Sequence, residues 1–338
     1  MTTLRRQDAL WKHALGDSLL GNRGLIKANM MLLPWAVMLA RGGLFLRPGT
    51  ASTFFLMLIV VFGWLMTCIL ANDLADSRDD QAAGKRRWIN RLPSPARVAV
   101  TGVLVCLGPG VLILSRAPVR ALWTYVGAAA LGLAYSLKPL RLKGRGVGGV
   151  LGYSASCTLA YVFIPWAWLG SSWRILAVMG IAVFLDKWVN LHFHQIIDLA
   201  GDKVQGVETH AVLTGAARAR RYLQYWAWTA ALWFGFVLME ATAAEPRGWR
   251  IAGLAIVAGA SVMGGLSVAC LSRKLRPDSS LVRELPPAYL ASAFAVFRIL
   301  PLILIIRFCL EAPALWPVAG AAGLLVGVES LMLFRYPS

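Results

Sequence analysis

A row of carboxylate and amide side chains stands directly after a long apolar segment. Residues 72–80 read Asn-Asp-Leu-Ala-Asp-Ser-Arg-Asp-Asp. Because residues three and four positions apart share one face of a helix, Asn72, Asp76 and Asp80 would line one stripe. Asp73 would lie beside it. Mg²⁺ prefers oxygen ligands and commonly binds one or two carboxylates together with substrate phosphates. This first acidic motif therefore predicts a site that holds a diphosphate through bridging Mg²⁺.

A second set of polar residues runs along another apolar segment. Its members recur every four residues and are Asp186, Asn190, His194, Asp198 and Asp202. A polar stripe on a membrane helix usually faces the interior of a bundle and marks function. Asp198 and Asp202, the second acidic motif, follow an apolar segment as the first motif does. This recurrence weighs against the simpler interpretation of either motif as a solvated helix end neutralised by nearby Lys and Arg.

Two residues of the same stripe allow a plainer interpretation. We favour an interior hydrogen-bonding role for His194 over a catalytic one. Asp186 precedes Lys187, and an internal ion pair is as compatible with this neighbour as a functional pair.

A basic loop lies between the two acidic motifs. Residues 135–143 read Tyr-Ser-Leu-Lys-Pro-Leu-Arg-Leu-Lys. Lys138, Arg141 and Lys143 could bind phosphate oxygens, since Arg forks and Lys ammonium groups both pair with them. Taken alone, the loop would be ordinary basic sequence beside a membrane span. The glycine-rich run 144–149 follows a membrane span and not a buried strand, so we interpret it as a flexible connection and not as a nucleotide loop.

The composition predicts an all-α, polytopic membrane protein. Of the 338 residues, 58% are apolar, against about 45–50% in soluble domains. About 20 apolar residues cross the hydrocarbon core as a helix. The candidate spans are 25–46, 51–71, 96–115, 119–137, 148–170, 174–197, 222–243, 248–271, 288–310 and 312–334. The last two are separated only by Glu311-Ala312-Pro313, so nine and ten helices are both tenable.

The formal net charge of +18 follows the alternation of the spans. Basic residues concentrate in the loops 72–95, 138–147, 198–221 and 272–287, which is the positive-inside pattern. We therefore predict that these loops are cytoplasmic, that the charge attracts anionic membrane lipid, and that nucleic acid is not a partner. The expected location is a bacterial inner membrane, and the sequence does not indicate an oligomeric state.

The expected organisation is a cytoplasmic amphipathic segment, 1–24, followed by a single membrane domain, 25–338. The first 24 residues are polar and lack the apolar core of a signal peptide. The five cysteines all fall within apolar spans without metal-ligand spacing, and we expect them to be packing residues without disulfides. They are Cys68, Cys106, Cys157, Cys270 and Cys309.

These motifs together resemble the UbiA superfamily of intramembrane prenyltransferases. The first acidic motif is similar to the family's Asn-Asp-x-x-Asp-x-x-x-Asp, and the second to its Asp-x-x-x-Asp region. Residues 135–143 resemble the family's Tyr-Ser-x-x-Pro-x-Arg-Leu-Lys stretch. The agreement in order, spacing and membrane position extends over about residues 25–310.

The resemblance implies a bundle of nine helices around a central cavity, with a prenyl diphosphate held at its cytoplasmic mouth. It assigns Asn72, Asp73, Asp76 and Asp80 to one Mg²⁺ and diphosphate site and Asp198 and Asp202 to the facing one. The chain departs from better-known members in its first span. Lys27-Ala28-Asn29 stands where they often have an Arg-Pro stretch, so Lys27 and Asn29 are hypothetical acceptor contacts.

The expected reaction is transfer of an allylic isoprenyl chain from its diphosphate to an aromatic or lipid acceptor. Mg²⁺ would neutralise the leaving pyrophosphate with help from Lys138, Arg141 and Lys143. The allylic cation would need a dry chamber, and aromatic faces could stabilise it. The candidate aromatics, each also compatible with plain packing, are Trp64, Tyr135, Tyr153 and Tyr161.

Several alternatives stay open at this stage. Asp198 could orient or deprotonate the acceptor, and a role in metal binding alone is equally compatible. The same ionising site could serve a UbiA-type terpene cyclase. A non-enzymatic carrier of a phosphorylated lipid would also need Mg²⁺-bridged acids, although carriers favour a site near the membrane midplane. Neither the acceptor nor the length of the prenyl chain is indicated by any residue.

Overall fold

The computed structural model describes residues 25–77, 87–243 and 284–335, together with a few single residues between 248 and 259. The predicted N-terminal segment 1–24 and Asp80 lie outside the described residues, as does most of the predicted span 248–271. Within these ranges the chain is helical, and an isolated parallel bridge between Gly146 and Thr209 is the strand-like pairing found there. The prediction of an all-α membrane bundle is confirmed at this level, and the number of spans stays a prediction.

Long apolar helices account for most of the described chain. The helices on which the site depends are η2 (Leu25–Met31), α2 (Leu32–Gly42), α3 (Thr50–Ala75), α5 (Ser94–Leu114), α6 (Val119–Ser136), α7 (Val147–Thr158), η6 (Leu159–Phe163), α8 (Ile164–Leu169), α9 (Trp173–Ile197), α10 (Leu199–Val204), α11 (His210–Thr214), α12 (Ala216–Thr242), α15 (Pro287–Phe294), η7 (Ala295–Ile299), α16 (Leu300–Glu311) and α17 (Trp316–Arg335). Both η6 and η7 are π-helical turns between α-helices.

Within the residues that the structure describes, five helical stretches are long and apolar enough to cross a membrane. They are Thr50–Ala75, Ser94–Leu114, Val147–Leu169, Trp173–Ile197 and Pro287–Glu311, and Pro313–Glu329 is a shorter apolar helix. In two of the five stretches, Val147–Leu169 and Pro287–Glu311, proline or glycine residues mark where a helical segment begins or ends. Pro165 and Pro301 stand within the first two positions of α8 and α16, where a missing N–H costs least, and Gly170 ends α8 with a φ of +75°.

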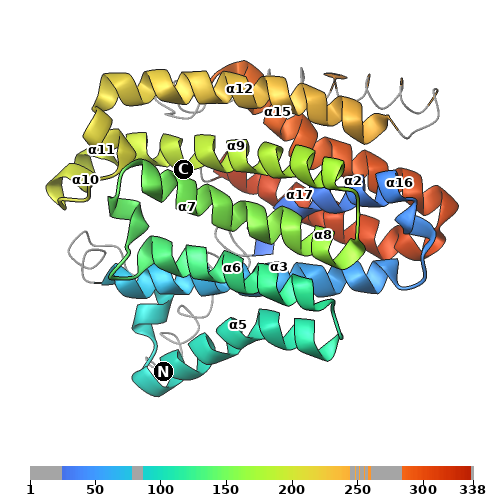
Figure 1. The fold of residues 1–338 in the computed structure, drawn as a ribbon, viewed down its shortest axis with the longest axis horizontal. Helices are drawn as coiled ribbons and strands as arrows, with labels where there is room; N and C mark the ends of the chain where they lie inside the picture. Colours follow the sequence, from blue (N-terminus) through green and yellow to red (C-terminus); the bar gives the residue numbers. More distant parts are fainter. Residues whose placement is uncertain are drawn as a thin grey trace.

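The helices run side by side across the bundle (Figure 1). From α12 at one edge, the order passes through α9, α7, α6 and α3 to α5 at the other edge, and each of these neighbours packs against the next. The later helices pack back onto the start of the described chain, because α16 contacts α2 and α17 contacts η2. One continuous core of buried apolar side chains joins them.

The loops that carry the predicted chemistry gather at one end of this bundle. The C-terminal ends of α3, α6 and α9 point the same way, and α10 and α11 lie at that end in Figure 1. We call this end of the bundle the mouth. Helices of this length therefore bring residues separated by more than 100 positions in the sequence to a common face.

Candidate functional site

The first acidic motif begins on the last turn of α3. The helix ends at Ala75, and Asp76 closes it by donating its backbone N–H to the carbonyl of Asn72 at 2.9 Å. The predicted stripe is thus helical as far as Asp76, and Asn72 and Asp76 lie on neighbouring turns at the mouth.

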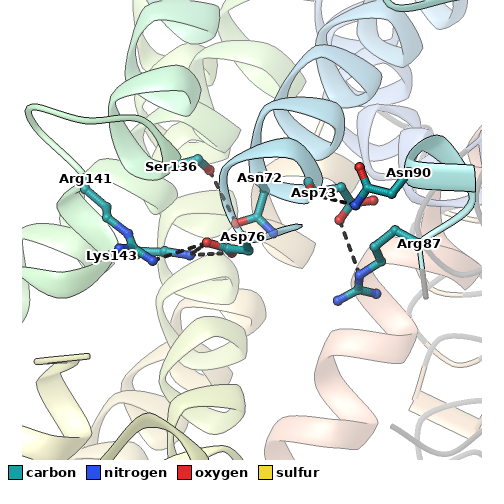
Figure 2. A network of polar contacts seen from close by, with 8 residues as sticks. All are labelled: Asn72, Asp73, Asp76, Arg87, Asn90, Ser136, Arg141 and Lys143. Carbon is teal, nitrogen blue, oxygen red and sulfur yellow. Dashed lines mark hydrogen bonds and ion pairs between the residues drawn. The ribbon is translucent and has the colours of Figure 1, made fainter. Parts of the chain in front are cut away.

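Two cations of the basic loop hold the Asp76 carboxylate. Lys143 Nζ forms an ion pair with both carboxylate oxygens, and Arg141 Nη2 lies 3.3 Å from Oδ1. Figure 2 shows both side chains reaching toward Asp76 from the loop after α6. The side chains of Asp76 and Lys143 are only 15% and 14% exposed, so the pair is screened less than a surface ion pair. The structure therefore joins the first acidic motif to the basic loop.

The basic loop reaches Asp76 through an unusual backbone. Arg141 has a φ of +35°, a conformation that costs energy for a residue with a Cβ and that tends to cluster at functional sites. At the other end of the loop, Ser136 Oγ donates to Asn72 Oδ1 at 3.4 Å. Lys138 lies in the exposed part of the same loop, and within the described residues it has no acidic partner. The structure therefore brings Arg141 and Lys143 to the acidic motif but not Lys138.

Asp73 faces another direction. Its side chain is fully buried, and Arg87 Nε lies 3.6 Å from its Oδ1. Asn90 Nδ2 donates to the Asp73 backbone carbonyl at 3.3 Å. Figure 2 shows Asp73 turned toward Arg87 and Asn90, away from the pair formed by Asp76 and Lys143. Asp73 thus anchors the segment that follows the motif, and its role as a metal ligand stays a prediction.

The second acidic motif caps α9 as Asp76 caps α3. Asp198 donates its backbone N–H to the carbonyl of His194 at 2.9 Å, and its side chain is exposed. Asp202 lies on the short helix α10, where Thr209 Oγ1 donates to its Oδ2 at 3.2 Å. The hydrogen bond from Thr209 therefore orients the Asp202 carboxylate at the mouth.

Backbone contacts dock the basic loop onto the second acidic motif. Gly146 donates its N–H to the carbonyl of Glu208 at 2.9 Å and pairs with Thr209 in the isolated bridge. Gly146 has a φ of +56°, and a Cβ there would lie 2.8 Å from Leu213. The glycine-rich run is therefore a packing point between two loops and not simply the flexible connection that we expected.

Tyr135 lies between the two acidic motifs. It interacts electrostatically with Asp202, Asp76 and Asp198, so both motifs lie near one half-buried tyrosine at the mouth. Its ring lies 5.7 Å from that of Tyr153. The predicted aromatic residues thus come together in two contacts, because the rings of Trp64 and Tyr161 also lie 5.4 Å apart, edge to face.

The described part of the mouth offers fewer than three clustered metal ligands. Its donor set nevertheless fits Mg²⁺ in kind, because Asn72, Asp76, Asp198 and Asp202 supply carboxylate and amide oxygens without thiolate or imidazole. Mg²⁺ usually keeps waters and takes its remaining ligands from substrate phosphates. The cations beside Asp76 suit a polyanion that arrives together with such an ion. These residues therefore fit a metal that binds with its substrate.

Other predicted residues lie outside the two acidic motifs. His194 is in the last turn of α9 near the mouth, where it interacts electrostatically with Lys27 and Asp198. Asp186 and Lys187 do form the internal ion pair that we considered, at 3.0 Å. Asn29 donates to Glu329 on α17, a contact that the sequence did not predict. A lone Glu within the apolar run of α17 is the signal that could have revealed it.

Comparisons with known proteins agree with these observations. The model of the UbiA prenyltransferase family matches residues 29–280. No curated protein sequence matches the chain. Solved structures show the fold: a UbiA homolog from Archaeoglobus fulgidus bound to DMAPP and Mg²⁺ is 18% identical, with a TM-score of 0.56 over 84% of this chain and 98% of that one.

Two further solved structures are similar to the same extent. The A. fulgidus homolog bound to GPP and Mg²⁺ is 17% identical, with a TM-score of 0.55 over 85% of this chain and 98% of that one. A digeranylgeranylglyceryl phosphate synthase is 16% identical, with a TM-score of 0.54 over 84% of this chain and 93% of that one.

Proposed function

The chain belongs to the UbiA prenyltransferase family, and we propose that it is a Mg²⁺-dependent enzyme that transfers an allylic prenyl group from its diphosphate to a lipophilic or aromatic acceptor within the membrane. The observation that carries this proposal is the pairing of Asp76 with Arg141 and Lys143, near a tyrosine, Tyr135, that also interacts electrostatically with Asp198 and Asp202. Structures of similar fold have been solved with DMAPP or GPP and Mg²⁺, which supports a prenyl diphosphate as the donor.

The cationic side chains of the mouth have a direct part in this reaction. The bond between C1 of the prenyl group and the diphosphate oxygen breaks heterolytically, and its electron pair leaves with pyrophosphate. Lys143 and Arg141 lie where they can exchange the Asp76 carboxylate for diphosphate oxygens, as an ammonium and a guanidinium group respectively. When bound, Mg²⁺ supplies Lewis-acid neutralisation of the leaving group.

The carboxylates and phenols act on the other side of the reaction. A nucleophilic atom of the acceptor forms the new bond to C1 and then loses a proton. Asp198, exposed at the end of α9, is the candidate to receive it. Below the mouth, the faces of Tyr135 and Tyr153 can stabilise positive charge on the allylic carbon, and the apolar core excludes water that would trap it.

The test is turnover by the purified full-length chain. Labelled dimethylallyl, geranyl, farnesyl and geranylgeranyl diphosphates are incubated with Mg²⁺, with and without a panel of phenolic, alcohol and glycerol-phosphate lipid acceptors. We expect pyrophosphate release that depends on one acceptor class, with a prenylated product. Release without acceptor, with a cyclic hydrocarbon as product, would replace transfer by cyclisation. Binding of a phosphorylated lipid without turnover of any donor would contradict an enzymatic role.

The orientation of the site is part of the proposal. The basic loops that form the mouth match the positive-inside pattern, so we place the mouth at the cytoplasmic face of a bacterial inner membrane. A diphosphate made in the cytoplasm would then reach the site without crossing the bilayer.

A further inference from the structure

A network of charged side chains lies deep in the bundle, away from the mouth. Asp186 Oδ2 lies 3.0 Å from Lys187 Nζ on α9, and Asp186 Oδ1 accepts a hydrogen bond from Tyr289 at 3.0 Å. Arg298 and Glu329 form a second ion pair at 2.7 Å between η7 and α17. Ionisable groups at this depth are costly in a membrane protein and by default indicate function.

The network lies at a definite depth below the diphosphate site. Twelve residues of α9 separate Asp186 from Asp198, which corresponds to about 18 Å along a helix. The two ion pairs belong to one cluster, because Arg298 and Tyr161 each interact electrostatically with a carboxylate of both pairs. The network is therefore a layer near the middle of α9 and is separate from the proposed diphosphate site.

A row of aromatic side chains leads from the mouth to this layer. Tyr135, beside the acidic motifs, contacts Tyr153, which stands eight positions before Tyr161 along α7 and η6. Lys187 Nζ lies 5.7 Å from the centroid of the Tyr161 ring. Tyr153 also interacts electrostatically with Tyr161, so these three tyrosines form a row from the mouth to the charged layer.

Two further observations mark the layer as more than packing. Tyr161 and Arg298 each stand on a π-helical turn, η6 and η7, and such turns frequently occur at functional sites. The side chains of Asp186, Lys187, Arg298 and Glu329 remain 10–15% exposed, so packing does not seal them. A hydrocarbon tail that reached these side chains would contact charged groups in place of apolar ones. It would also remove water from those charged groups, which costs free energy.

We propose that this charged layer is the floor of the chamber that holds the donor's prenyl tail, and that it sets an upper limit to the tail's length. The inference rests on the proposed function and names a substrate property of that same site. A tail that ends above Tyr161 and Lys187 binds against apolar and aromatic walls, whereas a longer tail meets the two ion pairs.

The experiment compares donors of increasing length in variants that lower the floor. Asp186→Ala with Lys187→Ala removes both members of one ion pair, so no unpaired charge remains from it. Tyr161→Ala removes the ring that lies beside Lys187 and leaves the net charge unchanged. For each protein, kcat/KM is measured with geranyl, farnesyl and geranylgeranyl diphosphate and the best acceptor of the wild type. We expect the ratio of long to short donor to rise at least about tenfold, the order by which a pocket discriminates added apolar carbons.

Matched variants separate this effect from general damage. Tyr161→Phe keeps the ring, and Arg307→Ala with Glu311→Ala removes an ion pair near the end of α16, so both should keep the wild-type ratio. An unchanged ratio in Tyr161→Ala and in the double variant would overturn the floor while leaving the proposed function intact. If Tyr161→Ala and the double variant both lost turnover with every donor, the proposed floor would also be overturned, because a deeper chamber should still accept the short tail. If the wild type turns over no donor, the proposed function itself fails and the floor falls with it.

Discussion

At the scale of single residues, we assign the proposed chemistry to the carboxylates at the helix ends. Asp76 and Asp198 both follow the last turn of a long apolar helix, where backbone carbonyls without helical partners add negative potential. Cations therefore gather there. Lys143 and Arg141 fill this role in the structure, and a metal bound with the diphosphate would add to it.

Removal of either carboxylate should abolish turnover. Asp76→Ala and Asp198→Ala each delete an oxygen donor from one side of the site, and metal-assisted charge neutralisation is worth several kcal/mol, so kcat/KM should fall at least about a hundredfold. Initial rates of pyrophosphate release at donor concentrations well below KM measure this ratio. Glu311→Ala, at the C-terminal end of α16, is a control for loss of a carboxylate elsewhere. Undiminished activity in both site variants would refute the assignment.

The two lysines of the basic loop should differ in effect. Lys143 pairs with Asp76, whereas Lys138 is exposed and has no acidic partner in the described part of the chain. A charge-assisted hydrogen bond contributes about 1.5–3 kcal/mol, so Lys143→Met should raise KM for the donor at least about tenfold. Lys138→Met should change it much less. An equal increase in the KM for the donor in both variants would show that the loop rearranges to bring Lys138 to the diphosphate when substrate binds.

Metal dependence can be tested without mutation. Because Asn72, Asp76, Asp198 and Asp202 offer oxygen donors alone, we expect chelation by EDTA to stop pyrophosphate release and Mg²⁺ to restore it. Ca²⁺, which prefers longer bonds and more ligands, should restore it poorly. Full activity in EDTA would mean that Lys143 and Arg141 neutralise the leaving group by themselves.

At the scale of elements, the contact between the basic loop and the start of α7 decides where Lys143 lies. A Cβ on Gly149 would stand 2.7 Å from the Leu142 carbonyl oxygen and 3.1 Å from Lys143 Cα. These are backbone atoms and cannot move aside as the end of a flexible side chain can. The absence of a side chain at position 149 thus lets the loop pack directly on the helix.

The neighbouring glycine supplies a matched test of this packing. A Cβ on Gly148 would meet only Arg145 Cβ at 3.8 Å, an ordinary contact. Gly149→Ala should therefore displace Lys143, lower kcat/KM, and destabilise the loop by about 1–3 kcal/mol through overpacking. Gly148→Ala should be near wild type in activity and in thermal unfolding of the purified protein. Identical behaviour of the two variants would contradict the role given to Gly149.

At the scale of the whole molecule, the sequence predicts the helices and the shared face of the motifs better than the pairing between them. Apolar runs and their basic flanks show where helices cross the membrane, and the motif spacing placed Asn72 and Asp76 together. The direction of the Asp73 side chain depends on how α3 is rotated about its axis. The contacts of Glu329 with Asn29 and Arg298 depend on the packing of α17 against η2. Spacing along one segment does not fix such contacts, and it does not reveal the π-helical turns that present Tyr161 and Arg298.

The orientation of the bundle gives the last prediction. Arg47 precedes α3 and Asp76 follows it, so the two ends of this helix are about 39 Å apart at 1.5 Å per residue and lie at opposite membrane faces. Leu140, in the basic loop, is 49% exposed, and Arg47 is exposed at the opposite end. If basic loops face the cytoplasm, Leu140→Cys should react with a membrane-impermeant maleimide in inverted vesicles, and Arg47→Cys in intact spheroplasts.

The native chain provides the background for that measurement, because its cysteines fall within apolar segments and should remain unlabelled by a reagent that does not enter the bilayer. The reverse labelling pattern would place the diphosphate site on the outer face, away from the compartment where prenyl diphosphates are made. Such a result would leave the Asp76–Lys143 chemistry intact but would require a donor delivered from outside. The topology is therefore a separate and decisive test of how the site obtains its substrate.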